Sequence, residues 1–240
     1  MVSNNLTPFQ TIAHIHSDFT SKFGIPRQSG LVESVHSTII FEPAFRNPDA
    51  LRGLEGYSHI WLLWEFSESM GKEWSPTVRP PRLGGNKRMG VFATRSPFRP
   101  NPIGLSSVKI IGIELDTPKG PLIHVAGADL LDGTPIYDIK PYLPYTDSHP
   151  DAVGGFAFTP GEGAVKVEIS QEMLDKIPEF FRESTIELLE EDPRPGYQDD
   201  PDRVYHMEYA GFEVHFTVKD GILTVTDVTT GTHGENKEEI

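Results

Sequence analysis

The chain contains no cysteine. A disulfide framework, a thiolate zinc site and a cysteine nucleophile are therefore all excluded. Its longest apolar run, residues 59–64, ends at Glu65 and is far shorter than the roughly 20 residues of a membrane-spanning helix. The first seven residues show neither the basic start nor the apolar segment of a secretory signal peptide. We therefore expect a cytoplasmic protein without a membrane span.

Basic residues are also scarce, since 21 Lys and Arg stand against 35 Asp and Glu, a formal net charge of -14. This balance disfavours a nucleic-acid partner, because phosphate contacts need Lys and Arg. The acid is concentrated in residues 160–240, however, which hold 20 acidic and 7 basic side chains. Between Trp74 and Ile113 there is no acidic residue at all, and this basic segment can attract a polyanion locally because salt screens the distant acid. It contains Arg79, Arg82, Lys87, Arg88, Arg95, Arg99 and Lys109.

Glycine and proline are plentiful, at 22 and 21 residues, and favour turns and strands over long helices. Short runs rich in Val, Ile, Phe, Trp and Leu are predicted to be strands. They lie at 8–16, 37–42, 58–66, 89–95, 105–115 and 121–128. No helical pattern intervenes, so a closed or sandwiched all-β body is favoured over a doubly wound parallel sheet. Residues 75–86 and 141–151 are rich in Pro or Gly and are expected to be long loops.

The pattern changes after residue 159. Apolar side chains at three- and four-residue spacing predict an amphipathic helix over residues 171–191, restarted at Pro178. Strands are predicted at 204–209, 212–218 and 222–225, with a hairpin turn at 219–221. We therefore expect a mainly β domain over residues 1–159, followed by a small α+β domain over residues 160–240.

Several common chemistries have no signature here. Neither Gly-x-Gly-x-x-Gly nor Gly-x-x-x-x-Gly-Lys-Ser/Thr occurs, which disfavours Rossmann and P-loop nucleotide sites. The sequence around Ser106 is not a Gly-x-Ser-x-Gly nucleophile elbow. His14 and His16 form the only close histidine pair and have no third ligand near them in sequence, so no metal is expected.

What remains is a set of segments in which charged residues stand beside prolines. Proline limits the conformations that a loop loses when it binds a ligand, and Arg suits phosphate or carboxylate groups. Six such segments favour a binding role over ordinary turns. They lie at 26–28, 79–82, 95–104, 132–135, 138–142 and 192–197.

One of these segments carries a recognisable string, Gly90-Val-Phe-Ala-Thr-Arg-Ser-Pro-Phe-Arg-Pro-Asn101. Together with residues 26–32, 51–59, 76–86, 132–144 and 192–197, it resembles the TsaA-like, TrmO family of tRNA methyltransferases in order and spacing. The resemblance implies a β-barrel methyltransferase domain, S-adenosylmethionine as cofactor and a homodimer. It also implies methylation of the N6 nitrogen of threonylcarbamoyladenosine beside the anticodon of tRNA.

The resemblance further implies a cofactor pocket and its residues. Ser67 and Glu68 stand where some relatives have His-Gln, so we expect the backbone to make that contact. Arg27 or Arg95 suits the methionine carboxylate. The full predicted pocket consists of Pro26, Arg27, Gln28, Ser67, Glu68, Arg95, Leu105, Asp132, Gly133, Thr134 and Pro135.

Methyl transfer is a displacement that positioning accelerates, and the urea-like nitrogen is a poor nucleophile that a carboxylate would help by accepting its proton. Asp138 is the predicted base. Lys140 beside it is predicted to bind the threonyl carboxylate or a tRNA phosphate, so both are candidate catalytic residues. The predicted tRNA contacts are Arg79, Arg82, Arg88, Arg99, Tyr142, Arg194 and Tyr197.

Two alternatives from other classes remain open. The first is a module that binds S-adenosylmethionine and RNA as a sensor and transfers nothing. The second is a metal-independent hydrolase of a small anionic substrate that uses Asp138 and Lys140. Cofactor binding without product would support the sensor, and activity without S-adenosylmethionine would support the hydrolase.

Overall fold

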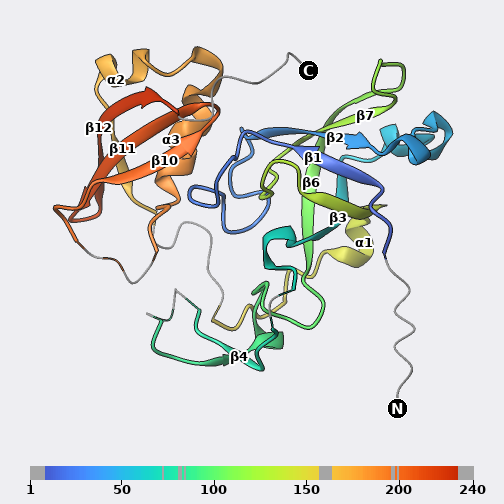
Figure 1. Cartoon of the computed structure of the whole chain (residues 1–240), viewed down its shortest axis with the longest axis horizontal. Coiled ribbons are helices and arrows are strands. Elements are labelled where there is room, and N and C mark those ends of the chain that lie inside the picture. The colour runs from blue at the N-terminus through green and yellow to red at the C-terminus, as the bar shows by residue number, and fades with distance from the viewer. Residues whose placement is uncertain are drawn as a thin grey trace.

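The computed structural model describes residues 9–71, 73–80, 83, 85–156, 164–195, 198 and 200–231. Its strands form a closed barrel of six strands, a four-stranded sheet and a two-stranded ribbon (Figure 1). The order around the barrel is β1-β2-β7-β6-β3-β8, and all neighbouring pairs are antiparallel. The strands are β1 (Ala13–His16), β2 (His36–Phe41), β3 (His59–Glu65), β6 (Ile103–Glu114), β7 (Leu122–Ala126) and β8 (Pro135–Pro141).

Alternating burial closes this sheet around its own core. Along β3, Ile60, Leu62 and Trp64 are buried while the residues between them are partly exposed. Side chains alternate between the two faces of a strand, so the buried set points into the barrel. A barrel also removes the unpaired edges of an open sheet. The predicted mainly β fold is confirmed.

Two segments differ from the predicted strands. Residues 89–95 were expected to form one strand, but only β5 (Met89–Gly90) is extended, and it pairs with β4 (Thr77–Val78) before a 3-10 turn at Val91–Ala93. Strand β8 was not predicted, because the prolines at its two ends mask a strand pattern. The expected loop at 141–151 contains a short helix, α1 (Pro144–Asp147).

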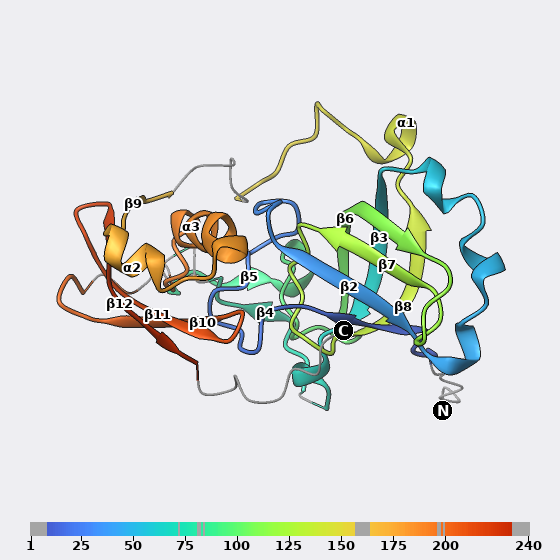
Figure 2. The same cartoon turned by 90° about the horizontal axis from the view of Figure 1, so that it is seen from above.

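The C-terminal part is a four-stranded sheet with helices on one face (Figure 2). The expected helix at 171–191 is broken into α2 (Gln171–Asp175), a 3-10 turn at Glu179–Phe181 and α3 (Arg182–Glu190). The restart at Pro178 is as predicted, since proline disfavours helical geometry in the residue before it. The sheet order is β10-β11-β12-β9. Its strands are β9 (Lys166–Glu168), β10 (Tyr205–Tyr209), β11 (Phe212–Lys219) and β12 (Ile222–Thr230).

The segment between β1 and β2 packs against the C-terminal sheet. Phe19, Val32 and Val35 belong to the same buried cluster as the C-terminal strands. The Ala210 amide donates to the Asp18 carbonyl at 3.1 Å. Part of the N-terminal half is therefore held by the C-terminal sheet. The predicted domain boundary at 159/160 lies outside the described residues.

None of the helices in the described part of the chain has the length and apolar composition needed to cross a lipid bilayer.

Candidate functional site

A cavity of about 410 Å³ opens where β3 ends and β6 begins. Eight of the eleven residues predicted for the cofactor pocket line it, and so does Arg99, which was predicted to contact tRNA. These residues come from segments that lie far apart in the sequence. The eight are Pro26, Arg27, Gln28, Ser67, Glu68, Arg95, Leu105 and Thr134.

The inner wall of the cavity is aromatic. The Trp64 indole packs against the Phe66 ring with their centroids 4.3 Å apart. Gly104 lies directly opposite Trp64 in the β3–β6 register, and a Cβ at this glycine would stand 2.2 Å from the indole. Any larger residue at position 104 would therefore clash with the indole. Leu105 follows and is 49% exposed, which adds an apolar surface at the opening.

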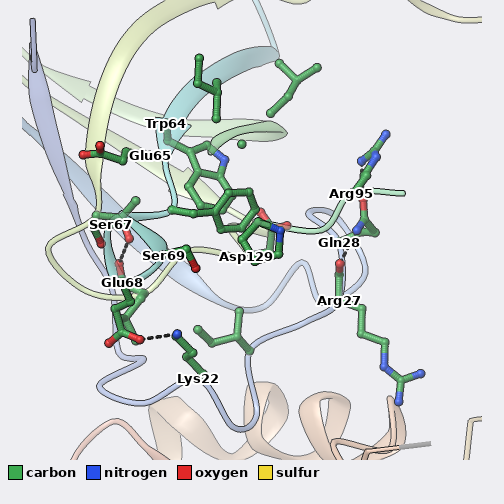
Figure 3. A pocket seen from close by; sticks show the side chains of 18 of the residues that line it. Lys22, Arg27, Gln28, Trp64, Glu65, Ser67, Glu68, Ser69, Arg95 and Asp129 are labelled. Carbon is green, nitrogen blue, oxygen red and sulfur yellow. Dashed lines mark hydrogen bonds and ion pairs between the residues drawn. The ribbon is translucent and has the colours of Figure 1, made fainter. Parts of the chain in front are cut away.

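A chain of hydrogen bonds leads from this wall to an acid. The Trp64 Nε1 donates to Ser106 Oγ at 2.9 Å, and Ser106 Oγ donates to Asp129 Oδ1 at 2.6 Å. Asp129 lines the cavity beside the indole (Figure 3). Burial raises the pKa of Asp129, while the Ser106 hydrogen bond and the nearby Arg95 oppose that rise. The cavity thus holds one carboxyl in a poorly hydrated position.

Charged side chains form the rest of the rim. Arg95 donates to the Gln28 side chain, and Lys22 pairs with Glu68 across the opening (Figure 3). The predicted segment 26–28 and the predicted Arg95 are therefore in direct contact. The Arg27 side chain extends away from Trp64 (Figure 3).

Arg27 reaches the loop after α3. Its guanidinium donates to the carbonyl oxygens of Asp192 at 2.9 Å and Arg194 at 3.3 Å. Arg194 itself makes a two-point contact with the Asp192 carboxylate, both distances being 2.8 Å, and these hydrogen bonds raise the pKa of Arg194. Arg194 thus lies in an internal ion pair beside the pocket loop. Tyr197, predicted together with it, lies outside the described residues.

Asp132, Gly133 and Pro135 do not line the cavity. The Asp132 carboxylate accepts the Ser17 amide at 3.0 Å and lies 3.4 Å from His16 Nδ1. Gly133 has a positive φ of 73°, which favours glycine in the turn. This turn holds β8 against β1 and so positions Thr134, which does line the cavity.

Asp138 and Lys140 lie on the outer face of the barrel and form an ion pair at 2.8 Å. In the strand register Asp138 is next to Leu63, which is next to Leu105 of the cavity. Two strand spacings separate Asp138 from Leu105, about 10 Å. Asp138 and Lys140 therefore lie outside the cavity, on the same outer face of the barrel as Leu105 at its opening.

Tyr142 lies near the other end of β3, since its amide donates to the His59 carbonyl at 3.0 Å. Its ring packs near Trp61, with centroids 5.6 Å apart. The seven residues from His59 to Glu65 span about 20 Å of strand. The structure thus does not bring Tyr142 to the cavity.

The basic segment borders the cavity on one side. Arg79 and Arg88 are exposed, and Arg88 donates to Thr77 Oγ1 at 3.1 Å. Arg99 is partly buried at the cavity and donates to the Thr94 carbonyl at 3.3 Å. Arg82 lies outside the described residues. The cations on the described part of this segment therefore run from open surface into the cavity.

Comparison with known proteins identifies the family to which this fold belongs. The N-terminal part, residues 14–148, matches the model of the tRNA-methyltransferase O N-terminal domain, and residues 163–231 match that of the TrmO C-terminal domain. The chain belongs to the tRNA-methyltransferase O family. The resemblance that the motif strings carry in the sequence is thereby confirmed.

Individual relatives agree with the family match. The chain is 42% identical over 221 residues to a tRNA (adenine(37)-N6)-methyltransferase of Escherichia coli, covering 88% of this chain and 93% of that one. It is 50% identical over 175 residues to one from Eikenella corrodens, covering 72% and 97%. A crystal structure of TrmO from Pseudomonas aeruginosa superposes with a TM-score of 0.77 at 35% identity, covering 96% of this chain and 100% of that one.

Sequence reasoning missed the inner wall of the cavity. Trp64, Phe66 and Asp129 were not among the predicted residues, although all three line the cavity of this tRNA-methyltransferase O family member. One signal was available for Asp129, because it is the only charged residue in the apolar run 121–131. In the sequence, Trp64 and Phe66 indicated only a buried strand.

Proposed function

We propose that this chain uses S-adenosylmethionine to methylate the N6 nitrogen of adenosine 37 in tRNA, beside the anticodon, where that nitrogen carries a threonylcarbamoyl group. One observation carries the proposal: three separate motif segments meet around one cavity with an aromatic wall and a buried carboxyl. Family membership agrees with it, because curated relatives are named tRNA (adenine(37)-N6)-methyltransferases.

The cavity suits the proposed cofactor chemically. When bound, S-adenosylmethionine supplies a methyl group made electrophilic by a cationic sulfur. The aromatic faces of Trp64 and Phe66 suit both a purine and a cation. Asp129 can accept hydrogen bonds from ribose hydroxyls or the amino group, and Arg95 or Arg99 can bind a carboxylate in a two-point contact.

The residues of this chain have two tasks in the transfer. The first is to hold the reacting groups in line and exclude water, which can contribute roughly 7–11 kcal/mol. The Trp64–Ser106–Asp129 chain serves it by fixing the inner wall. The second is to accept the N6 proton. We assign that task to Asp138, with Lys140 beside it to bind the threonyl carboxylate or a phosphate.

Binding and kinetic measurements distinguish the proposed roles of Asp129 and Asp138. Asp129→Asn is expected to weaken cofactor binding, whereas Asp138→Asn is expected to lower kcat by about 100-fold or more with cofactor affinity unchanged. Isothermal titration with S-adenosylmethionine and steady-state kinetics measure the two effects. If Asp129→Asn alone lowers kcat and Asp138→Asn has wild-type kinetics, Asp129 is the base and the assignment to Asp138 is wrong.

We infer that the basic segment binds the anticodon stem-loop. Arg79 and Arg88 are exposed and lie in a stretch without acidic residues. Each phosphate contact that is lost reduces the slope of log affinity against log salt by about 0.7–0.9. Arg79→Ala and Arg88→Ala are therefore each expected to flatten that slope while S-adenosylmethionine affinity stays unchanged. An unchanged slope in both variants would contradict this interface.

We also infer a cytoplasmic homodimer, with one unit at 1–159 and a second at 160–240. Within one chain, the loop at 192–195 contacts the pocket segment through Arg27, which joins the two units. Arg194 and Tyr197 are proposed as further tRNA contacts. Analytical ultracentrifugation at micromolar protein is expected to give twice the 26.7 kDa chain mass, and a sharp monomer peak would contradict the dimer.

The activity itself is tested with purified protein and methyl-labelled S-adenosylmethionine. The substrates are two anticodon stem-loop RNAs that differ only in the threonylcarbamoyl group on adenosine 37. We expect label only in the modified RNA. Cofactor binding without labelled RNA would favour the sensor, and turnover of an anionic substrate without cofactor would favour the hydrolase.

A further inference from the structure

The outer face of the C-terminal sheet gathers two imidazoles and one carboxylate. His206 on β10 lies directly opposite His215 on β11, and Glu213 precedes His215 by two residues. Residues two apart on a strand share a face. The alternate positions of β11 are buried in the core, so His206, Glu213 and His215 all lie on the solvent side.

The ligand atoms of these three side chains are close together. Glu213 Oε2 lies 2.8 Å from His215 Nε2 and 3.7 Å from His206 Nδ1. All three atoms lie within 4.8 Å of one another. Tetrahedral zinc with bonds of about 2.0–2.1 Å holds its ligand atoms about 3.3 Å apart, so shifts of about 1 Å would bring these three into that geometry.

We propose that His206, Glu213 and His215 form a binding site for a divalent transition-metal ion of the zinc class. Two imidazoles and one carboxylate suit zinc, nickel or copper, whereas magnesium and calcium prefer oxygen ligands alone. The side chain of His206 is 51% exposed, so water can fill the remaining coordination position. The excess of acid in residues 160–240 attracts cations to this part of the chain.

Sequence spacing does not indicate this site. Two histidines nine positions apart meet only because the β10–β11 hairpin sets them opposite each other. The prediction that no metal binds rested on His14 and His16. In the structure each of these has one carboxylate beside it, Glu42 at 2.8 Å or Asp132 at 3.4 Å, and neither pair is part of a three-ligand group among the described residues.

The site has a structural consequence. β10 is the edge strand of its sheet, and an ion shared between His206 and His215 ties it to β11. On the opposite face of β10, Met207 packs so close to Gly24 that a Cβ there would stand 2.6 Å from the Met207 side chain. Metal binding therefore stabilises the strand that supports the loop leading to the cofactor pocket.

The test is calorimetric titration of the full chain, stripped with a chelator and returned to chelator-free buffer. With zinc chloride and nickel chloride we expect one saturable site per chain, and with magnesium chloride none. His206→Ala and His215→Ala are each expected to weaken that site by about tenfold or more, since even losing an outer partner of a ligand costs that much. His124→Ala is the matched control, because His124 pairs with a single carboxylate, Glu114, at 2.7 Å.

A second readout is the thermal unfolding midpoint with and without zinc. A ligand that binds only the folded chain raises this midpoint. We expect the rise in wild type and in His124→Ala and its loss in His206→Ala, with all metal-free variants retaining the wild-type far-ultraviolet circular dichroism. Equal zinc affinity in wild type, His206→Ala and His215→Ala would overturn the proposal, and so would the absence of a saturable site in wild type.

Discussion

Replacing Ser106 by Ala removes one hydroxyl that serves two partners at the inner wall of the cavity. Trp64 Nε1 donates to Ser106 Oγ at 2.9 Å, and this oxygen donates to Asp129 at 2.6 Å. Both Trp64 and Ser106 are buried. An unsatisfied buried donor costs about 1–3 kcal/mol, and a lost hydrogen bond to a charged group about 1.5–3 kcal/mol. Since the two effects share one site and do not simply add, we expect about 3 kcal/mol lower unfolding free energy.

The variant is also expected to bind S-adenosylmethionine more weakly, because Asp129 loses the group that orients it. Without the opposing hydrogen bond, the pKa of Asp129 rises further. Urea unfolding followed by tryptophan fluorescence measures the stability, and isothermal titration measures the affinity. Ser107→Ala is the control, since its side chain points to the other face of β6, and it is expected to stay within about 0.5 kcal/mol of wild type. If Ser106→Ala also stays within that range, the hydrogen-bond chain has no energetic role.

Three further variants probe the same neighbourhood. Gly104→Ala places a methyl group against the Trp64 ring. We expect it to lower the free energy of unfolding by about 1–3 kcal/mol and to weaken cofactor binding. A variant with the wild-type urea midpoint and wild-type cofactor affinity by calorimetry would contradict the close contact. Burial raises the pKa of the Asp129 carboxyl, so the folded chain favours its protonated form. This contribution to the free energy of unfolding is fully present below the pKa that Asp129 has in the unfolded chain, and it is lost as pH rises through the pKa that Asp129 has in the folded chain. The urea midpoint of Asp129→Asn should therefore rise relative to that of wild type as pH increases from about 4 to 8. A difference between the two midpoints that does not change with pH would refute the raised pKa of Asp129. Asp192→Asn removes the ion pair with Arg194 and is expected to lower the free energy of unfolding by about 2 kcal/mol. Faster proteolysis of the 192–195 loop is the readout. An unchanged cleavage rate would argue against a structural role for this ion pair.

Much of the barrel could be predicted from the sequence, because alternating burial leaves a pattern along each strand. β3 is the clearest case, with Ile60, Leu62 and Trp64 inside. β8 could not be predicted, because prolines stand at both of its ends and its inward residues are few. The string at 89–95 was expected to be a strand because Val91 and Phe92 favour extended geometry, but Val91–Ala93 turns in 3-10 geometry.

The site divides in the same way. Segments with proline and charge, such as Pro26-Arg27-Gln28 and Arg95, could be found because their motif strings are distinctive, and the structure brings them to one cavity. Asp129 could not be assigned, because its importance comes from burial and from a serine 23 positions away. Asp138 and Lys140 lie outside the cavity, and their catalytic role stays a prediction.

The most direct measurement of the central claim is mass spectrometry of tRNA nucleosides. The tRNA comes from a strain lacking this protein and is analysed before and after incubation with the purified protein and S-adenosylmethionine. We predict that a threonylcarbamoyladenosine peak gains the mass of one methyl group, and that omitting the cofactor prevents the gain. An unchanged nucleoside profile with folded, cofactor-binding protein would contradict the proposed methyl transfer.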